Sequence, residues 1–229
     1  MIQDDLSRAI LIEPLKEGYD ELKILSAYAT PTMLSWFVKN IYHKAQAPIS
    51  IQVIVGMVPF DGLSVSVHEG FNQLVTSQLP NEVKSLKCSY VYEMPPYHSN
   101  LYIWAKGGKA ELAFMGSACF VQSSFIGNSR KELMVKCDPV SATQVFEEAE
   151  GRSIYCNHGE VEEYVMLRPS HPVLDLESNL IESTSDLDSV TLSLLTREGV
   201  PGRRSGLNWG QRKGREPNQA YIHLPSKIA

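Results

Sequence analysis

A histidine, a serine in a Gly-Ser turn and a glutamate lie close together in the chain and suit chemistry on a phosphate ester. His98 and Asn100 are two residues apart in a predicted strand over 98–104, so we expect both to project from one face. The turn at Ser117 offers backbone N–H and hydroxyl donors to an anion. Glu132 can accept a hydrogen bond from a histidine nitrogen and fix its tautomer. Such a set suits covalent phosphoryl transfer by a histidine nucleophile without a metal.

A purely structural interpretation of the same residues stays open at this point. A single histidine on an otherwise apolar strand is more often a half-buried core residue, and Gly-Ser is a common turn pair. Spacing alone therefore does not separate a catalytic His98 from a structural one.

Alternating strand and helix patterns surround these residues. The stretch 19–28 looks like a helix end that runs into a strand, and the turn around Lys106–Lys109 joins two further strands. We predict strands over 49–58, 88–94, 98–104, 110–115 and 131–137, and helices over 31–46, 63–78 and 140–150. This order predicts an α/β fold with a mixed or parallel sheet covered by helices.

The C-terminal part differs in composition from the rest of the chain. Residues 169–189 are acidic and rich in Ser and Pro, which is typical of a linker, and a new strand is expected at 189–196. Residues 197–229 hold seven basic and two acidic residues, a net charge of +5; because the whole chain carries −5, residues 1–196 carry −10. A basic end of this kind favours contact with a polyanion, although a solvated basic tail explains the charge equally well.

Several stretches resemble the NgoFVII-type restriction endonucleases, a nuclease family of the phospholipase D superfamily. The superfamily signature is His-x-Lys, then roughly twenty residues, then Gly-Ser-x-Asn and an acidic residue. This chain has His98-Ser-Asn100, Gly116-Ser117-Ala-Cys119 and Glu132. The similarity continues in FVQSSF (120–125), RKELMVKCDP (130–139), SIYCNHGEVEEYV (153–165) and SGLNWGQRKGREPNQAYIHLP (205–225).

The resemblance implies a role for each matching residue. His98 would attack the scissile phosphorus, and His98 of a second subunit would protonate the leaving oxygen, because the family carries one motif copy per chain. Ser117 would help to hold the phosphate, and Glu132 would orient His98. This chemistry implies a homodimer and no cofactor or metal.

Two positions depart from the signature. Asn100 stands where the family has lysine, and Cys119 stands where it has asparagine. A neutral amide replaces a full positive charge, and a thiol is a weak donor. Losing one such preorganised contact typically costs about 3–4 kcal/mol, roughly 10²–10³-fold in rate. We therefore expect cleavage of phosphodiesters to be very slow or lost.

The resemblance also implies the domain organisation and the partners. We expect a phospholipase D-like nuclease domain over 1–168, a linker over 169–188, and the start of a truncated, B3-like β domain over 189–229 that contacts double-stranded DNA. Subunits of a restriction system are further possible partners. The predicted DNA-binding residues are Arg203, Arg204, Asn208, Trp209, Gln211, Arg212, Arg215, Asn218 and Tyr221.

Other function classes find less support in the sequence. No window approaches 18 consecutive apolar residues, and the N-terminus lacks the basic and apolar regions of a signal peptide, so we expect a cytoplasmic protein that does not enter a membrane. Cys156 and His158 offer two metal ligands, but no further residue completes a metal-binding set.

Two alternative functions remain open. The chain could be a non-catalytic dimeric DNA-binding module, or a superfamily member that acts on a lipid phosphodiester.

Overall fold

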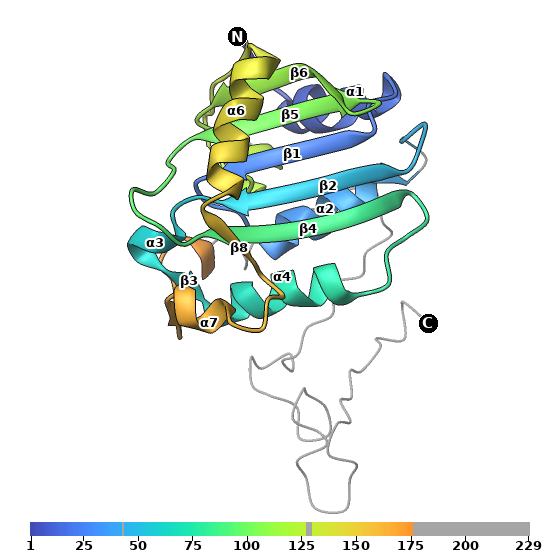
Figure 1. The fold of residues 1–229 in the computed structure, drawn as a ribbon. Coiled ribbons are helices and arrows are strands. Elements are labelled where there is room, and N and C mark those ends of the chain that lie inside the picture. The colour runs from blue at the N-terminus through green and yellow to red at the C-terminus, as the bar shows by residue number, and fades with distance from the viewer. Residues whose placement is uncertain (43, 127–129, 176–229) are drawn as a thin grey trace, which may run out of the picture. The chain divides into compact units, whose positions relative to one another are not determined.

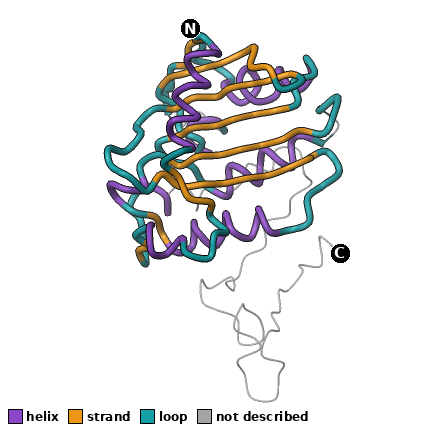
Figure 2. The backbone as a smooth tube through the Cα atoms, in the orientation of Figure 1, coloured by secondary structure: helices purple, strands orange, loops and turns teal. Residues whose placement is uncertain are grey.

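Seven strands form one mixed sheet, which Figures 1 and 2 show as a single layer. The computed structural model describes residues 1–42, 44–126 and 130–175, all within the first of two compact units, Met1–Ser183. The strand order is β7-β6-β5-β1-β2-β4-β8. The strands are β1 (Glu21–Ser26), β2 (Ile49–Val55), β4 (Val83–Val91), β5 (Asn100–Lys106), β6 (Lys109–Gly116), β7 (Met134–Cys137) and β8 (Ser153–Tyr155).

The centre of the sheet is parallel and its flanks are antiparallel. β2 pairs in parallel with β1 on one side and with β4 on the other. β5 runs antiparallel to β1, β6 to β5, β7 to β6, and β8 to β4. The C-terminal half of β2, Val53–Val55, is apolar and buried and suits this central position, whereas Ser50 and Gln52 in its first half are only partly buried. The predicted mixed sheet flanked by helices is confirmed.

Helices cover both faces of the sheet. One face packs against α6 (Pro139–Glu150), which crosses β6, β5, β1 and β2 in Figure 1 and buries Phe146 against Leu25, Ile54 and Ile103. The larger core lies on the other face. Its helices are η1 (Ser7–Ile12, a π-helical turn), α1 (Glu13–Lys16), α2 (Pro31–Ile41), α3 (Val58–Asp61) and α4 (Val65–Thr76).

Local signals explain where the two best-defined helices begin. The Thr30 hydroxyl accepts a hydrogen bond from the Met33 amide at 3.3 Å, and Pro31 occupies the first turn of α2. Asp138 caps α6 in the same way by accepting from the Ser141 amide at 2.8 Å. The predicted helix over 140–150 and the turn at Lys106–Lys109 are confirmed, whereas α2 ends at Ile41 rather than at 46.

Several predicted strand boundaries were wrong, and two of them concern site residues. β5 begins at Asn100, so His98 lies in the preceding loop and does not share a strand pleat with Asn100. β7 begins at Met134, so Glu132 also precedes its strand. The loop before β5 is held elsewhere, because the Tyr97 amide donates to the Gly56 carbonyl at 3.1 Å after the end of β2. Similarly, residue 58 belongs to α3 and not to the strand predicted over 49–58.

The packed chain continues beyond residue 168. A small second sheet pairs β3 (Leu63–Ser64) with β9 (Leu167–Arg168), and a short helix α7 (Val161–Tyr164) precedes β9. His171 and Leu174 are buried, so the segment to residue 175 packs on the domain although the sequence predicts a linker from 169. The rest of that linker and the strand predicted at 189–196 lie outside the described residues.

Within the described residues, no helix is both long enough and apolar enough to cross a bilayer.

Candidate active site

All five predicted site residues lie along one side of the sheet, at the ends of its strands rather than beside an outermost strand. β1, β2, β4 and β6 run in one direction and end at this edge, whereas β5 and β7 run in the opposite direction and begin there. His98 and Asn100 therefore come to this edge at the start of β5, Ser117 and Cys119 follow β6, and Glu132 precedes β7. We call this the catalytic edge.

Asn100 is built into the backbone of the catalytic edge. Its side chain is 4% exposed. The carbonyl oxygen Oδ1 accepts from the Ser26 hydroxyl at 2.9 Å and from the Ala27 amide at 3.2 Å. The amide Nδ2 donates to the carbonyls of Gly116 and Ser117 at 3.2 and 3.1 Å. All four bonds stay within the protein, so Asn100 joins the end of β1 to the end of β6 rather than offering a donor to a ligand.

Cys119 is a partly buried, neutral thiol. Burial raises its pKa above the ordinary thiol value, and the nearby charge of Glu132 acts in the same direction. Hydrogen bonds from the Tyr28 backbone and the Asn100 side chain act against these effects without reversing them. At neutral pH this position therefore supplies neither a thiolate nor the amide donor of an asparagine.

The hydroxyl of Ser117 and the carboxylate of Glu132 are hydrogen-bonded to each other. The Ser117 hydroxyl donates to Glu132 Oε2, and it accepts from the Leu133 amide at 2.9 Å. The other carboxylate oxygen accepts from the Ser124 hydroxyl at 2.8 Å. The sequence predicted that Glu132 orients His98, but in this structure its side-chain hydrogen bonds go to Ser117 and Ser124.

His98 is exposed at the catalytic edge. Among the described residues, no hydrogen bond or ion pair involves its imidazole. Its backbone, in contrast, is closely confined, because Tyr97 on one side bonds to Gly56 and Asn100 on the other side bonds to β1 and β6. The His98 imidazole is thus exposed on a stretch of backbone that is held on both sides.

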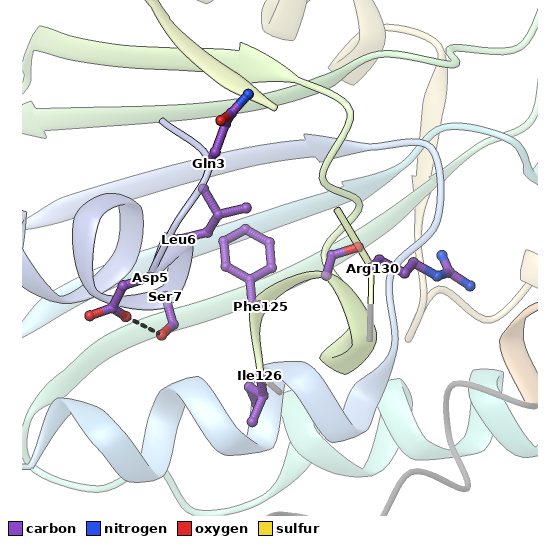
Figure 3. A pocket seen from close by; sticks show the side chains of 8 residues that line it. Gln3, Asp5, Leu6, Ser7, Phe125, Ile126 and Arg130 are labelled. Carbon is purple, nitrogen blue, oxygen red and sulfur yellow. Dashed lines mark hydrogen bonds between the residues drawn. The ribbon is translucent and has the colours of Figure 1, made fainter. Parts of the chain in front are cut away.

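A cavity of about 490 Å³ opens beside Ser117 and Glu132. Its wall includes Arg130 and Lys131, so positive charge is present at its rim together with the carboxylates of Glu132 and Asp4. A second pocket of about 280 Å³ adjoins it on the side of α5 (Gln122–Phe125). Figure 3 shows Leu6 facing the ring of Phe125 in this second pocket, with the Arg130 side chain directed away from that ring.

A partly buried polar cluster of Tyr28, Asp61 and His171 lies at the same edge and was not predicted from the sequence. The Tyr28 hydroxyl donates to Asp61 Oδ2 at 2.7 Å, and Nε2 of the buried His171 lies 3.5 Å from the same oxygen. Burial and the bond to Asp61 raise the pKa of Tyr28. Nδ1 of His171 accepts from the amides of Val173 and Leu174 at 3.2 and 3.1 Å, which leaves Nε2 as the protonated nitrogen. No local pattern marks residues so far apart in the chain.

Ser124 was also missed as a site residue, although it lies within the quoted stretch 120–125. Its position one helical turn after Val121, facing Glu132, could not be read from spacing alone.

The predicted DNA-binding residues lie outside the described residues. Among the residues that are described, no group of three or more His, Cys, Asp or Glu side chains is arranged to hold a metal ion.

Several solved structures are similar to this chain at low sequence identity. The solved structure of Nuc, a phospholipase D family member from Salmonella typhimurium, is similar at 13% identity and a TM-score of 0.41, covering 65% of this chain and 89% of Nuc. NucT from Helicobacter pylori is similar at 14% identity and a TM-score of 0.42, covering 68% and 96%. A search among curated proteins found no match.

Two family models match the chain. Residues 4–163 match the N-terminal phospholipase D domain of the NgoFVII restriction endonucleases, and residues 182–229 match their C-terminal B3-like DNA-binding domain. The first match includes all five residues of the catalytic edge named above, and the second includes the basic segment. The chain therefore belongs to the NgoFVII restriction endonuclease family.

Proposed function

We propose that this chain binds double-stranded DNA through residues 182–229 and that its phospholipase D-like domain hydrolyses phosphodiesters very slowly or not at all. The chemistry in question is attack by His98 on phosphorus, which breaks one ester P–O bond and forms a phosphohistidine. The leaving oxygen takes a proton from His98 of the second chain, and water then cleaves the P–N bond to release the phosphate monoester. The match to a B3-like DNA-binding domain supports DNA as the partner.

The hydrogen-bonding of Asn100 is the observation that carries the proposal. The position where the resemblance places lysine holds a buried amide whose four hydrogen bonds all go to the protein. It therefore brings no positive charge to the phosphoryl oxygens in the transition state. Cys119 adds a neutral thiol, so two electrostatic contacts are absent from a site that keeps His98.

A model-diester assay tests the proposal without depending on DNA binding. Wild-type chain and His98→Ala should hydrolyse bis(p-nitrophenyl) phosphate at the same background rate, with His158→Ala as a control for loss of an exposed histidine. Rapid wild-type hydrolysis that disappears in His98→Ala alone would contradict the proposal.

The double variant Asn100→Lys with Cys119→Asn tests the cause. If the two side chains limit the rate, this variant should gain His98-dependent hydrolysis by about 10²-fold or more, in proportion to the restored contacts. Circular dichroism must first show that the variant is folded, because lysine at position 100 removes four hydrogen bonds. A folded variant without gain would place the defect elsewhere in the pocket.

We further propose that two chains associate with their His98 side chains near a two-fold axis. The single motif supports this, because one copy cannot supply both the nucleophile and the acid. An exposed apolar strip beside the catalytic edge also supports it. Met115 and Val135 are direct cross-strand partners and are 45% and 37% exposed, and Leu133 is 41% exposed.

Salt dependence tests DNA binding. Binding measured by fluorescence anisotropy should weaken steeply with salt, because basic side chains displace counterions from phosphates. If Arg203 and Arg204 contact phosphates, replacing both with Gln should reduce the slope of log K against log[salt] by about 2. An unchanged slope would exclude these two arginines from the interface.

A further inference from the structure

Arg152, which is not part of the signature motif, connects the loop that carries His98 to the C-terminal end of α6. Arg152 follows α6 directly, and one of its terminal nitrogens donates to the Met94 carbonyl at 2.6 Å and approaches the Glu93 carbonyl at 3.4 Å. Its Nε lies 3.5 Å from the Glu93 carboxylate. These contacts hold the first part of the loop from β4 to β5.

The same guanidinium also holds the residue immediately before His98. It lies 5.6 Å from the centroid of the Tyr97 ring, within the range of a cation–π contact. The Tyr97 hydroxyl donates to Glu148 Oε1 at 2.8 Å, and Arg152 lies 3.9 Å from that oxygen. Tyr97 is thus held at its ring face by Arg152 and at its hydroxyl by α6.

The backbone of Tyr97 is fixed as tightly as its side chain. Its amide donates to the Gly56 carbonyl, and a Cβ atom at Gly56 would lie 2.3 Å from the Tyr97 carbonyl oxygen. Only a glycine at position 56 allows this approach. On the other side of His98, two residues along the chain, the hydrogen bonds of the Asn100 side chain hold the start of β5. His98 therefore stands between two anchors on a short span of chain.

We propose that Arg152, acting through Tyr97 and Glu148, is the positioning residue for His98. The inference rests on the proposed role of His98 as the reacting imidazole. Arg152 does not touch the imidazole. It restricts the backbone from which the imidazole projects, so that the nitrogen is presented toward the phosphorus in one orientation. The Arg152 side chain is 22% exposed, whereas the Glu93 and Glu148 side chains are 51% and 66% exposed, so each ion pair alone contributes little. The restraint comes from the combination of two carbonyls, the Tyr97 ring and two carboxylates on one guanidinium.

Amide hydrogen exchange in the full chain tests the proposal directly. In Arg152→Gln the segment 93–99 should exchange at least about tenfold faster than in wild type, because opening the loop releases the Tyr97 amide from Gly56. Exchange of β2 should stay unchanged. Arg8→Gln is the matched control, since Arg8 also forms an ion pair, with Glu13 at 2.9 Å, but on an exposed surface far along the chain.

The His98 imidazole supplies a second readout. In spectra of histidine-labelled protein, its Cε1–H resonance should shift or broaden in Arg152→Gln while that of the exposed His158 stays in place. Arg152→Lys keeps the charge but cannot reach both carbonyls and the ring at once, so it should restore the signal in part. Tyr97→Phe keeps the ring and loses only the bond to Glu148, and a smaller change is expected.

The outcomes separate positioning from general stability. Faster exchange confined to 93–99, with a changed His98 resonance, supports the proposal. Unchanged exchange there in both Arg152→Gln and Tyr97→Phe would overturn it, and so would a uniform increase that includes β2. Because neither measurement uses DNA or a diester, a chain that cleaves nothing still reports whether His98 is positioned.

Discussion

At the scale of single residues, the proposed function depends on which side chains occupy the two signature positions near His98. Asn100 differs from the family signature in charge, and Cys119 differs from it in hydrogen-bonding strength. Asn100 bonds only to the protein, and the Cys119 thiol is kept neutral by burial. Asn100 is therefore part of the hydrogen-bonded fold, and Cys119 offers only a weak donor.

Replacing Asn100 with aspartate tests its structural role. Asn100→Asp keeps the shape and the acceptor but places a carboxylate oxygen against the carbonyls of Gly116 and Ser117. We expect a loss of about 3 kcal/mol or more in the free energy of unfolding, measured by urea denaturation. Asn81→Asp, at an exposed turn position, should change it by less than about 0.5 kcal/mol. Equal effects at both positions would refute the bonded role of Asn100.

Thiol reactivity reports the state of Cys119. Because its pKa is raised, the thiolate fraction at pH 8 is below that of a free cysteine and increases only as pH rises further. Alkylation by iodoacetamide, followed at Cys119 by peptide mass spectrometry, should be slow in the folded chain and faster in urea at the same pH. Rapid labelling of folded protein near pH 7 would show a thiolate and contradict this view.

At the scale of elements, α6 connects the core to the catalytic edge. It covers one face of the sheet and begins after the Asp138 cap. Glu148 in its last turn and Arg152, two residues beyond its end, hold the loop of His98. Loss of helical order at α6 should therefore reach the catalytic edge, although no motif residue lies in the helix.

The cap of α6 makes a pH-dependent contribution. Hydrogen bonds from the Ser141 side chain and amide lower the pKa of Asp138. Its stabilisation is then complete above the unfolded-state pKa and is lost as pH falls through the lower folded-state pKa. Asp138→Ala should lower Tm at pH 7, and the difference from wild type should shrink in acid. Glu147→Ala, an exposed change on the same helix, serves as the control. A Tm difference that is independent of pH would argue against the cap.

At the scale of the whole molecule, the proposed function depends on a second copy of the chain. Met115→Lys with Val135→Lys places charge on the apolar strip, so we expect the dimer to dissociate while each chain stays folded. Sedimentation or light scattering at micromolar concentration measures the change. Val65→Lys, at a similarly exposed valine on α4, should leave the dimer intact. A wild-type monomer, or a double variant that remains dimeric, would contradict the proposed association.

The sequence alone was enough to predict several local elements of this protein and to indicate the family to which it belongs. Gly-Ser at 116–117, the Lys106–Lys109 turn and the helical pattern over 140–150 are signals carried by nearby residues, and the structure confirms those elements. The separated stretches of similarity indicated the NgoFVII family, and the family models show it. The position of Asn100 and Cys119 in the signature was likewise readable without coordinates.

Only the tertiary structure decided which groups contact Asn100 and where the backbone places His98. Asn100 bonds to Ser26 and Ala27, more than 70 residues away in the chain, and no local periodicity encodes such a pair. Nor does it encode that His98 leaves the strand, since that depends on Gly56 approaching Tyr97 and on Arg152 reaching the loop. Local propensity fixes backbone preference over a few residues. The partners of a buried amide or an exposed imidazole are fixed by the packing of the whole sheet.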